Sequence, residues 1–171
     1  MTGMDLSDAL WNEAVTASDY TGPDEKYRLA VFEQYKLCVQ MADQVSARRN
    51  LANTFFLSLN SAVAAALVAA AGGKLADASV WALLAGVLVL LAQCTAWFVI
   101  VRSYRLLNAA KFAVIGAFEE RLPAFAYSRA EWSALGEGRD WRRFLPLTHV
   151  EQWVPVIFAV AYLIGFLALV A

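Results

Sequence analysis

The chain has 171 residues, of which 60% are apolar and 17% are charged, and its formal net charge at pH 7 is −1. The apolar share exceeds the roughly 45–50% of an ordinary soluble domain, and the near-neutral charge disfavours nucleic acid as a partner. The composition therefore predicts a membrane protein whose charged residues are confined to segments outside the bilayer.

An acidic segment opens the chain. Residues 1–25 contain six Asp and Glu residues and no Lys or Arg. We expect residues 1–23 to be a mobile or loosely docked arm. The run Thr21-Gly22-Pro23-Asp24 then favours a helix start, because proline is tolerated in the first helical turn and acidic side chains complement the helix N-terminus.

A cytoplasmic helix is predicted over residues 24–49. Its apolar residues recur at spacings of three and four, as on one face of an amphipathic helix: Val31, Tyr35, Cys38, Ala42 and Val45. No helix-breaking residue separates this segment from the apolar run that follows. We therefore expect one helix from about residue 24 to residue 72, ended by Gly72-Gly73.

Three runs contain no charged residue, over residues 50–73, 78–101 and 152–171, with lengths of 24, 24 and 20 residues. At about 1.5 Å per residue, each is long enough to cross a hydrocarbon core roughly 30 Å thick. These runs are interpreted as three transmembrane helices. The absence of charged side chains and His from them disfavours a proton-coupled transporter.

The positive charges predict the orientation of these helices. Of the 14 Lys and Arg residues, five precede the first run and eight lie between the second and third, whereas Lys74 alone lies in the first link. Positive residues concentrate on the cytoplasmic side of membrane proteins. We therefore expect the N-terminus and residues 102–151 to be cytoplasmic and the C-terminus to lie outside.

The cytoplasmic segment 102–151 is predicted to be mainly helical. The second transmembrane helix has no breaker before Pro123, and its extension is expected to pack against the 24–49 helix through a stripe of five residues: Tyr104, Leu107, Phe112, Ile115 and Leu122. The chain is thus expected to be an all-α integral membrane protein in which the first two of three transmembrane helices extend into a cytoplasmic helical bundle.

Two capping-box patterns are expected to start the last helices. Ser128-Arg129-Ala130-Glu131 predicts a short helix, and Thr148-His149-Val150-Glu151 predicts the start of the third transmembrane helix, with Pro155 in an early turn.

Polar residues in the transmembrane runs form the first candidate site: Asn50, Asn53, Asn60 and Gln93. The three asparagines follow one helical face, and polar side chains in lipid require partners. One interpretation is a stripe that lines a pore or contacts another subunit. The other is ordinary hydrogen bonding between helices of one protomer, with Gln93 or Tyr162 as partners.

Cations near the predicted cytoplasmic boundary form the second candidate site: Arg48, Arg49, Arg102, Arg105, Asn108 and Lys111. Arginine presents a planar set of donors suited to phosphate, so this cluster fits an anionic lipid head group or a phosphate-bearing messenger. Anchoring at the membrane surface explains the same residues.

Signals for catalysis are weak. The chain has a single histidine, His149, and no phosphate-binding loop. The adjacent acids Glu119 and Glu120 are interpreted as a solvated helix face near Arg121. We expect no catalytic residue, no metal site and no cofactor.

Five stretches carry a resemblance to a known group: residues 35–50, 53–60, 104–112, 118–123 and 131–132. They resemble small bacterial integral membrane proteins of defence and nucleotide-signalling gene neighbourhoods, similar to the SLATT-type membrane effectors. This chain adds a third span to the simplest two-span pattern.

The resemblance implies an oligomeric effector of the bacterial inner membrane that permeabilises or depolarises the membrane on a cytoplasmic signal, in anti-phage defence. It implies membrane lipids, further copies of the chain, and a soluble signalling protein or nucleotide messenger as partners. The alternative is a non-conducting scaffold or nucleotide sensor that binds a soluble partner through its cytoplasmic helices.

Overall fold

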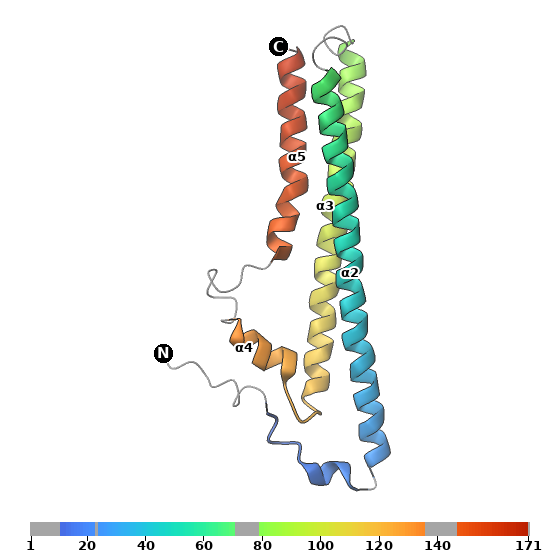
Figure 1. The fold of residues 1–171 in the computed structure, drawn as a ribbon, viewed down its shortest axis with the longest axis vertical. Helices are drawn as coiled ribbons and strands as arrows, with labels where there is room; N and C mark the ends of the chain where they lie inside the picture. The colour runs from blue at the N-terminus through green and yellow to red at the C-terminus, as the bar shows by residue number, and fades with distance from the viewer. Residues whose placement is uncertain (1–10, 23, 71–78, 136–146, 171) are drawn as a thin grey trace, which may run out of the picture. The chain divides into compact units, whose positions relative to one another are not determined.

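The computed structural model describes residues 11–22, 24–70, 79–135 and 147–170 (Figure 1). Its elements are η1 (Ala17–Tyr20), α2 (Glu25–Ala70), α3 (Val80–Glu119), η2 (Ala126–Glu131), α4 (Trp132–Ala134) and α5 (Leu147–Val170). Within these ranges the only strand-like pairing is one isolated bridge between Trp11 and Ala124. The predicted all-α class is confirmed.

The chain divides into two compact units. Residues 1–46 and 106–145 form one, called here the extramembrane unit, and residues 47–105 and 146–171 form the other, called the membrane unit. Helices α2 and α3 each contribute residues to both units. The single long helix predicted from about residue 24 to 72 is confirmed as α2, which has 46 residues. The pair Gly72-Gly73 lies outside the described residues.

Among the described residues, three helices are long and apolar enough to cross a membrane: α2, α3 and residues Val150–Val170 of α5. In the membrane unit, parts of α2, α3 and α5 lie side by side (Figure 1). Their contact is aromatic, because Trp97 stacks on Phe56 with ring centroids 5.8 Å apart and lies 6.0 Å from Phe158. Large apolar side chains cover the outside, including Leu51 and Trp81, which are 73% and 79% exposed. Lipid is the solvent that suits this surface.

The extramembrane unit pairs the first part of α2 with the last part of α3. The stripe predicted on α2 faces inward, with Ala42 and Val45 buried. On α3 the prediction is correct for Ile115 but wrong for Leu107 and Phe112, which are 46% and 44% exposed. The buried positions of α3 recur every seven residues, and Ile115 is one of them. Leu107 and Phe112 lie beside this buried face.

Both predicted helix starts need correction. The predicted helix start at Ser128 is wrong, because the helical segment η2 is a π-helix that starts at Ala126 and has Phe125 as its N-cap. Helix α5 begins at Leu147, so Pro155 is its ninth residue and lies beyond the first turn. A proline at that position leaves one backbone carbonyl without its helical donor. The side chains of residues 147–149 lie outside the described set.

Candidate functional site

Two of the predicted asparagines bind side chains of their own chain. Asn60 is fully buried on α2, and its Oδ1 and its backbone carbonyl each lie 3.1 Å from the hydroxyl of Tyr162 on α5. The thiol of Cys94 lies 3.7 Å from the same Oδ1. The indole of Trp97 donates to Oδ1 of Asn53 at 3.0 Å. These amides therefore join α2 to α3 and α5 in the membrane unit.

Gln93 and Asn50 lie in different surroundings. The Nε2 atom of Gln93 is buried and has no hydrogen-bond partner among the described residues. Asn50 is exposed on α2. The four residues of the first candidate site thus do not form one surface.

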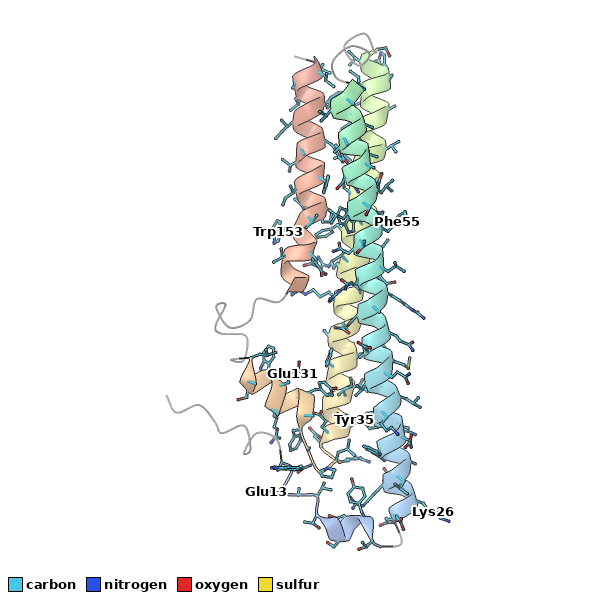
Figure 2. All side chains as sticks on the ribbon, in the orientation of Figure 1. Glu13, Lys26, Tyr35, Phe55, Glu131 and Trp153 are labelled. Atoms are coloured by element: carbon cyan, nitrogen blue, oxygen red, sulfur yellow. The ribbon has the colours of Figure 1, made fainter. Side chains whose placement is uncertain are left out.

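A row of exposed polar side chains follows Asn50 along α2. Its members are spaced at three and four residues, and we call them the hydroxyl row: Asn50, Thr54, Ser58 and Ser61. The neighbouring exposed face of α2 is apolar and includes Phe55, which is 60% exposed (Figure 2). The part of α2 in the membrane unit therefore presents one polar and one apolar exposed face.

The second candidate site is divided between the units. Arg49 forms an ion pair with Glu151 of α5, with 3.4 Å between Nε and Oε2, and both side chains are largely buried. Arg105 donates to the side-chain oxygen of Gln152 at 2.8 Å. These arginines attach α5 to α2 and α3. Glu151 balances the charge of Arg49, whereas the amide of Gln152 is neutral and does not balance that of Arg105.

The remaining members of that cluster are more dispersed. Arg48 and Arg102 are exposed in the membrane unit. Asn108 and Lys111 are half-buried in the extramembrane unit, where Oδ1 of Asn108 has no hydrogen-bond partner among the described residues.

Glu119 organises the extramembrane unit, and its assignment to a solvated face is wrong because its side chain is fully buried. Oε1 accepts the hydroxyl of Tyr35 at 3.1 Å and the backbone N–H of Tyr127 at 2.9 Å. Oε2 accepts the backbone N–H of Ser128 at 2.9 Å and the Ser128 hydroxyl. The carboxylate thus binds α2 and η2 to the end of α3, and Figure 2 labels Tyr35 on α2.

The same network changes the acidity of a tyrosine. Burial, followed by the charge of the Glu119 carboxylate, raises the pKa of the Tyr35 hydroxyl above its usual value of 10.0. The contact between Glu119 and η2 also depends on close packing at Gly116. A Cβ added at Gly116 would lie 3.2 Å from Cβ of Ser128.

The N-terminal arm is attached at Asn12, which is buried. Its Nδ2 donates to the backbone carbonyls of Glu120 and Leu122, at 3.2 and 2.9 Å. Asn12 therefore satisfies carbonyl groups that the end of a helix leaves without partners.

A cavity of about 300 Å³ lies beside this attachment. Its charged lining consists of Arg28 and Arg121 together with Asp24 and Glu120. Arg28 pairs with Asp19 at 3.2 Å, and Arg121 donates to the hydroxyl of Tyr27 at 2.8 Å. Two cations and two anions give no excess positive charge, so the cavity does not favour a phosphate ligand.

Comparison with models of known protein families shows which family the chain belongs to. The model of the octameric membrane protein family matches residues 32–171. The chain belongs to this family. No curated protein and no solved structure matches it.

Membership in the octameric membrane protein family agrees with the three apolar helices, so the chain is an integral membrane protein. The resemblance to SLATT-type effectors is supported only as far as a membrane protein family, and the finer grouping stays a prediction. The matched range begins inside α2 and includes the three charge-free runs, 50–73, 78–101 and 152–171.

Sequence reasoning missed several of the residues that hold these sites together. Glu151 and Gln152 stand directly at the start of the third apolar run, where an acid is a natural partner for Arg49 across the helices. That pairing could have been inferred from opposite charges at one membrane boundary. Asn12 carries no comparable signal, because its partners are backbone carbonyls more than 100 residues away.

Proposed function

We propose that this chain assembles in eight copies, as its family's description states, and that the assembly forms a conduction path across the membrane when a cytoplasmic signal arrives. The observation that carries the proposal is the hydroxyl row of α2. Its side chains lie in an apolar span yet are exposed within the described part of the chain. Facing lipid, such groups are unfavourable, whereas lining a shared aqueous path suits them.

Asn53 and Asn60 have a different role in this account. Their oxygens accept hydrogen bonds from Trp97 and Tyr162, so they hold one protomer together. The path would be lined by Thr54, Ser58 and Ser61 of each copy.

The proposed location, orientation and partners of the assembly follow from the charge distribution and from the resemblance to SLATT-type effectors. The assembly lies in the bacterial inner membrane with the N-terminus in the cytoplasm and the C-terminus outside. Its partners are lipids, further copies of the chain and a soluble protein or nucleotide messenger. Its output is permeabilisation in anti-phage defence, and it is not an enzyme.

Liposomes containing the purified full-length protein and an entrapped fluorescent dye test the conducting part of the proposal. We expect dye release by the wild type and at least a tenfold lower rate for Thr54→Leu/Ser58→Leu/Ser61→Leu. The matched control is Leu51→Ala/Phe55→Leu on the apolar exposed face, which should leak like the wild type. Equal leak by all three proteins would contradict a path along the hydroxyl row.

A second function, a non-conducting scaffold, is favoured by a different observation. The α2 segment of the extramembrane unit exposes Leu37 and Met41 at 58% and 53%. Exposed apolar side chains outside the bilayer suit a soluble protein partner. Capture of one such protein, lost in Leu37→Glu/Met41→Glu, together with intact liposomes, would favour the scaffold.

A further inference from the structure

A second cleft lies within the extramembrane unit, between the last turns of α3 and η2, and has a volume of about 330 Å³. We call it the η2 cleft. Its α3 side consists of three small residues and one acid: Ala113, Gly116, Ala117 and Glu120. Pockets for small molecules in proteins measure roughly 300–1,000 Å³. The η2 cleft is at the lower end of this range, so it suits a ligand as small as a single amino acid.

Arg129 gives the η2 side of the cleft a positioned set of donors. Its guanidinium carbon lies 3.9 Å from the centroid of the buried Phe125 ring, and both residues line the cleft. This contact holds the guanidinium against the ring, while its N–H groups lie in the guanidinium plane and remain accessible at the edge. Among the described residues the guanidinium has no hydrogen-bond or ion-pair partner. Its planar N–H groups match the two oxygens of a carboxylate.

The cavity beside the N-terminal arm offers no comparable donors. There Arg28 pairs with Asp19, and Arg121 donates to the hydroxyl of Tyr27. Both of these guanidinium groups are therefore already bonded within the chain. The arginine of the η2 cleft is the better candidate to bind an anionic group that comes from outside the chain.

Acceptors in the η2 cleft come from both of its sides. The hydroxyl of Ser128 donates its hydrogen to Oε2 of Glu119, so its oxygen has only lone pairs to offer a ligand. Glu120 is exposed on α3, and the described residues give its carboxylate no ion-pair partner. Carboxylate and hydroxyl oxygens accept hydrogen bonds from an ammonium group. The cleft thus offers acceptors for an ammonium as well as donors for a carboxylate.

The charges of the lining select the class of ligand. Glu120 and Arg129 carry opposite charges and form no ion pair with each other, so the lining has no net charge. A phosphate or a dicarboxylate would bring excess negative charge beside Glu120, and a simple amine would be repelled by Arg129. A zwitterion pairs with both groups. Since Ala113, Ala117 and Phe125 are apolar, the rest of the lining suits an aliphatic side chain.

We propose that the η2 cleft binds a free aliphatic amino acid, with its carboxylate on the guanidinium of Arg129 and its ammonium on the oxygens of Glu120 and Ser128. The backbone N–H and the hydroxyl of Ser128 also bind Glu119, the carboxylate that joins η2 to the long helices. Amino acid bound there stabilises the extramembrane unit, because it binds the folded form. The cleft lies within this unit, so binding does not require the assembly to conduct.

Isothermal titration calorimetry of the detergent-solubilised full chain tests the ligand class without any substitution. Alanine is compared with propionate and ethylamine, and leucine with isocaproate and isoamylamine, because these analogues lack either the ammonium or the carboxylate. Inorganic phosphate is titrated as well. We expect saturable binding of at least one of the two amino acids, and a Kd raised roughly tenfold or more for both of its analogues. Absence of saturable binding by both amino acids overturns the proposal, and so does an analogue or phosphate that binds as tightly.

Substitutions then test whether the amino acid lies in the η2 cleft. Arg129→Gln removes the donors for the carboxylate and Glu120→Gln removes the anion for the ammonium, so each is expected to raise the Kd by roughly tenfold to a hundredfold. The matched controls are Lys26→Gln and Glu131→Gln, both at exposed positions outside the lining, and they should keep the wild-type Kd (Figure 2). Circular dichroism checks that the helical content of each variant is unchanged. Wild-type affinity in either test variant would overturn the site.

Discussion

The hydroxyl of Tyr35 on α2 donates a hydrogen bond to Oε1 of Glu119 on α3, with 3.1 Å between the oxygens. Glu119 is fully buried, and backbone N–H groups of Tyr127 and Ser128 complete its coordination. One side chain thus holds two long helices and the following η2 turn together. A signal that rearranges this unit would therefore have to break hydrogen bonds to the Glu119 carboxylate.

We predict that Glu119→Gln destabilises the extramembrane unit although it preserves the size of the side chain. Each carboxylate oxygen accepts a backbone N–H, so either orientation of the amide turns an NH₂ group toward a donor. One unsatisfied buried donor costs about 1–3 kcal/mol. Urea unfolding of detergent-solubilised protein, followed by circular dichroism, measures the change. Glu120→Gln, at an exposed position, serves as the control, and equal stability of the two variants would contradict the prediction.

We predict that the Tyr35→Phe variant has a weaker dependence of stability on alkaline pH than the wild type. The folded-state pKa of Tyr35 is raised, so its contribution is fully present below pH 10.0 and is lost as pH rises from there through the folded value. The free energy of unfolding, measured for both proteins between neutral pH and alkaline pH, gives the difference. A wild-type minus variant difference that stays constant above pH 10.0 would argue against this linkage.

We predict that Tyr162→Phe lowers the stability of the membrane unit without reducing leak. The substitution removes the hydroxyl that bonds Oδ1 and the carbonyl of Asn60. Hydrogen bonds between membrane helices are worth about 0.6 kcal/mol on average. Denaturation in mixed detergent micelles reads the stability and dye release reads conduction. Val160→Ala, at an exposed position of α5, is the control, and a large fall in leak for Tyr162→Phe would show that Asn60 serves the path directly.

The fold could be predicted because it depends on long-range averages of the sequence. Charge-free runs of 20 residues or more and the absence of breakers between residues 24 and 70 indicate three spans and a continuous α2. Such patterns tolerate errors at single positions. The prediction therefore holds even though the starts of η2 and α5 differ from the capping boxes at Ser128 and Thr148.

The sites could be predicted only in part, because they depend on which residues meet across helices. The sequence placed Asn50, Asn53 and Asn60 on one helical face, whereas Asn60 is buried and Asn50 is exposed. Tyr162 was among the expected partners of these asparagines, and it bonds Asn60. It could not show that Glu119 is buried and Glu120 exposed, since that difference depends on how η2 packs after Pro123. The pairing of Arg49 with Glu151 likewise depends on where α5 returns.

The most direct test of the account is the membrane potential of bacteria after controlled induction, read with a voltage-sensitive dye. The wild type, the triple variant Thr54→Leu/Ser58→Leu/Ser61→Leu and Tyr162→Phe are compared at equal amounts of protein in the membrane. The account predicts depolarisation by the wild type and by Tyr162→Phe, and an unchanged potential for the triple variant. Depolarisation by the triple variant equal to that of the wild type would contradict a conduction path along the hydroxyl row.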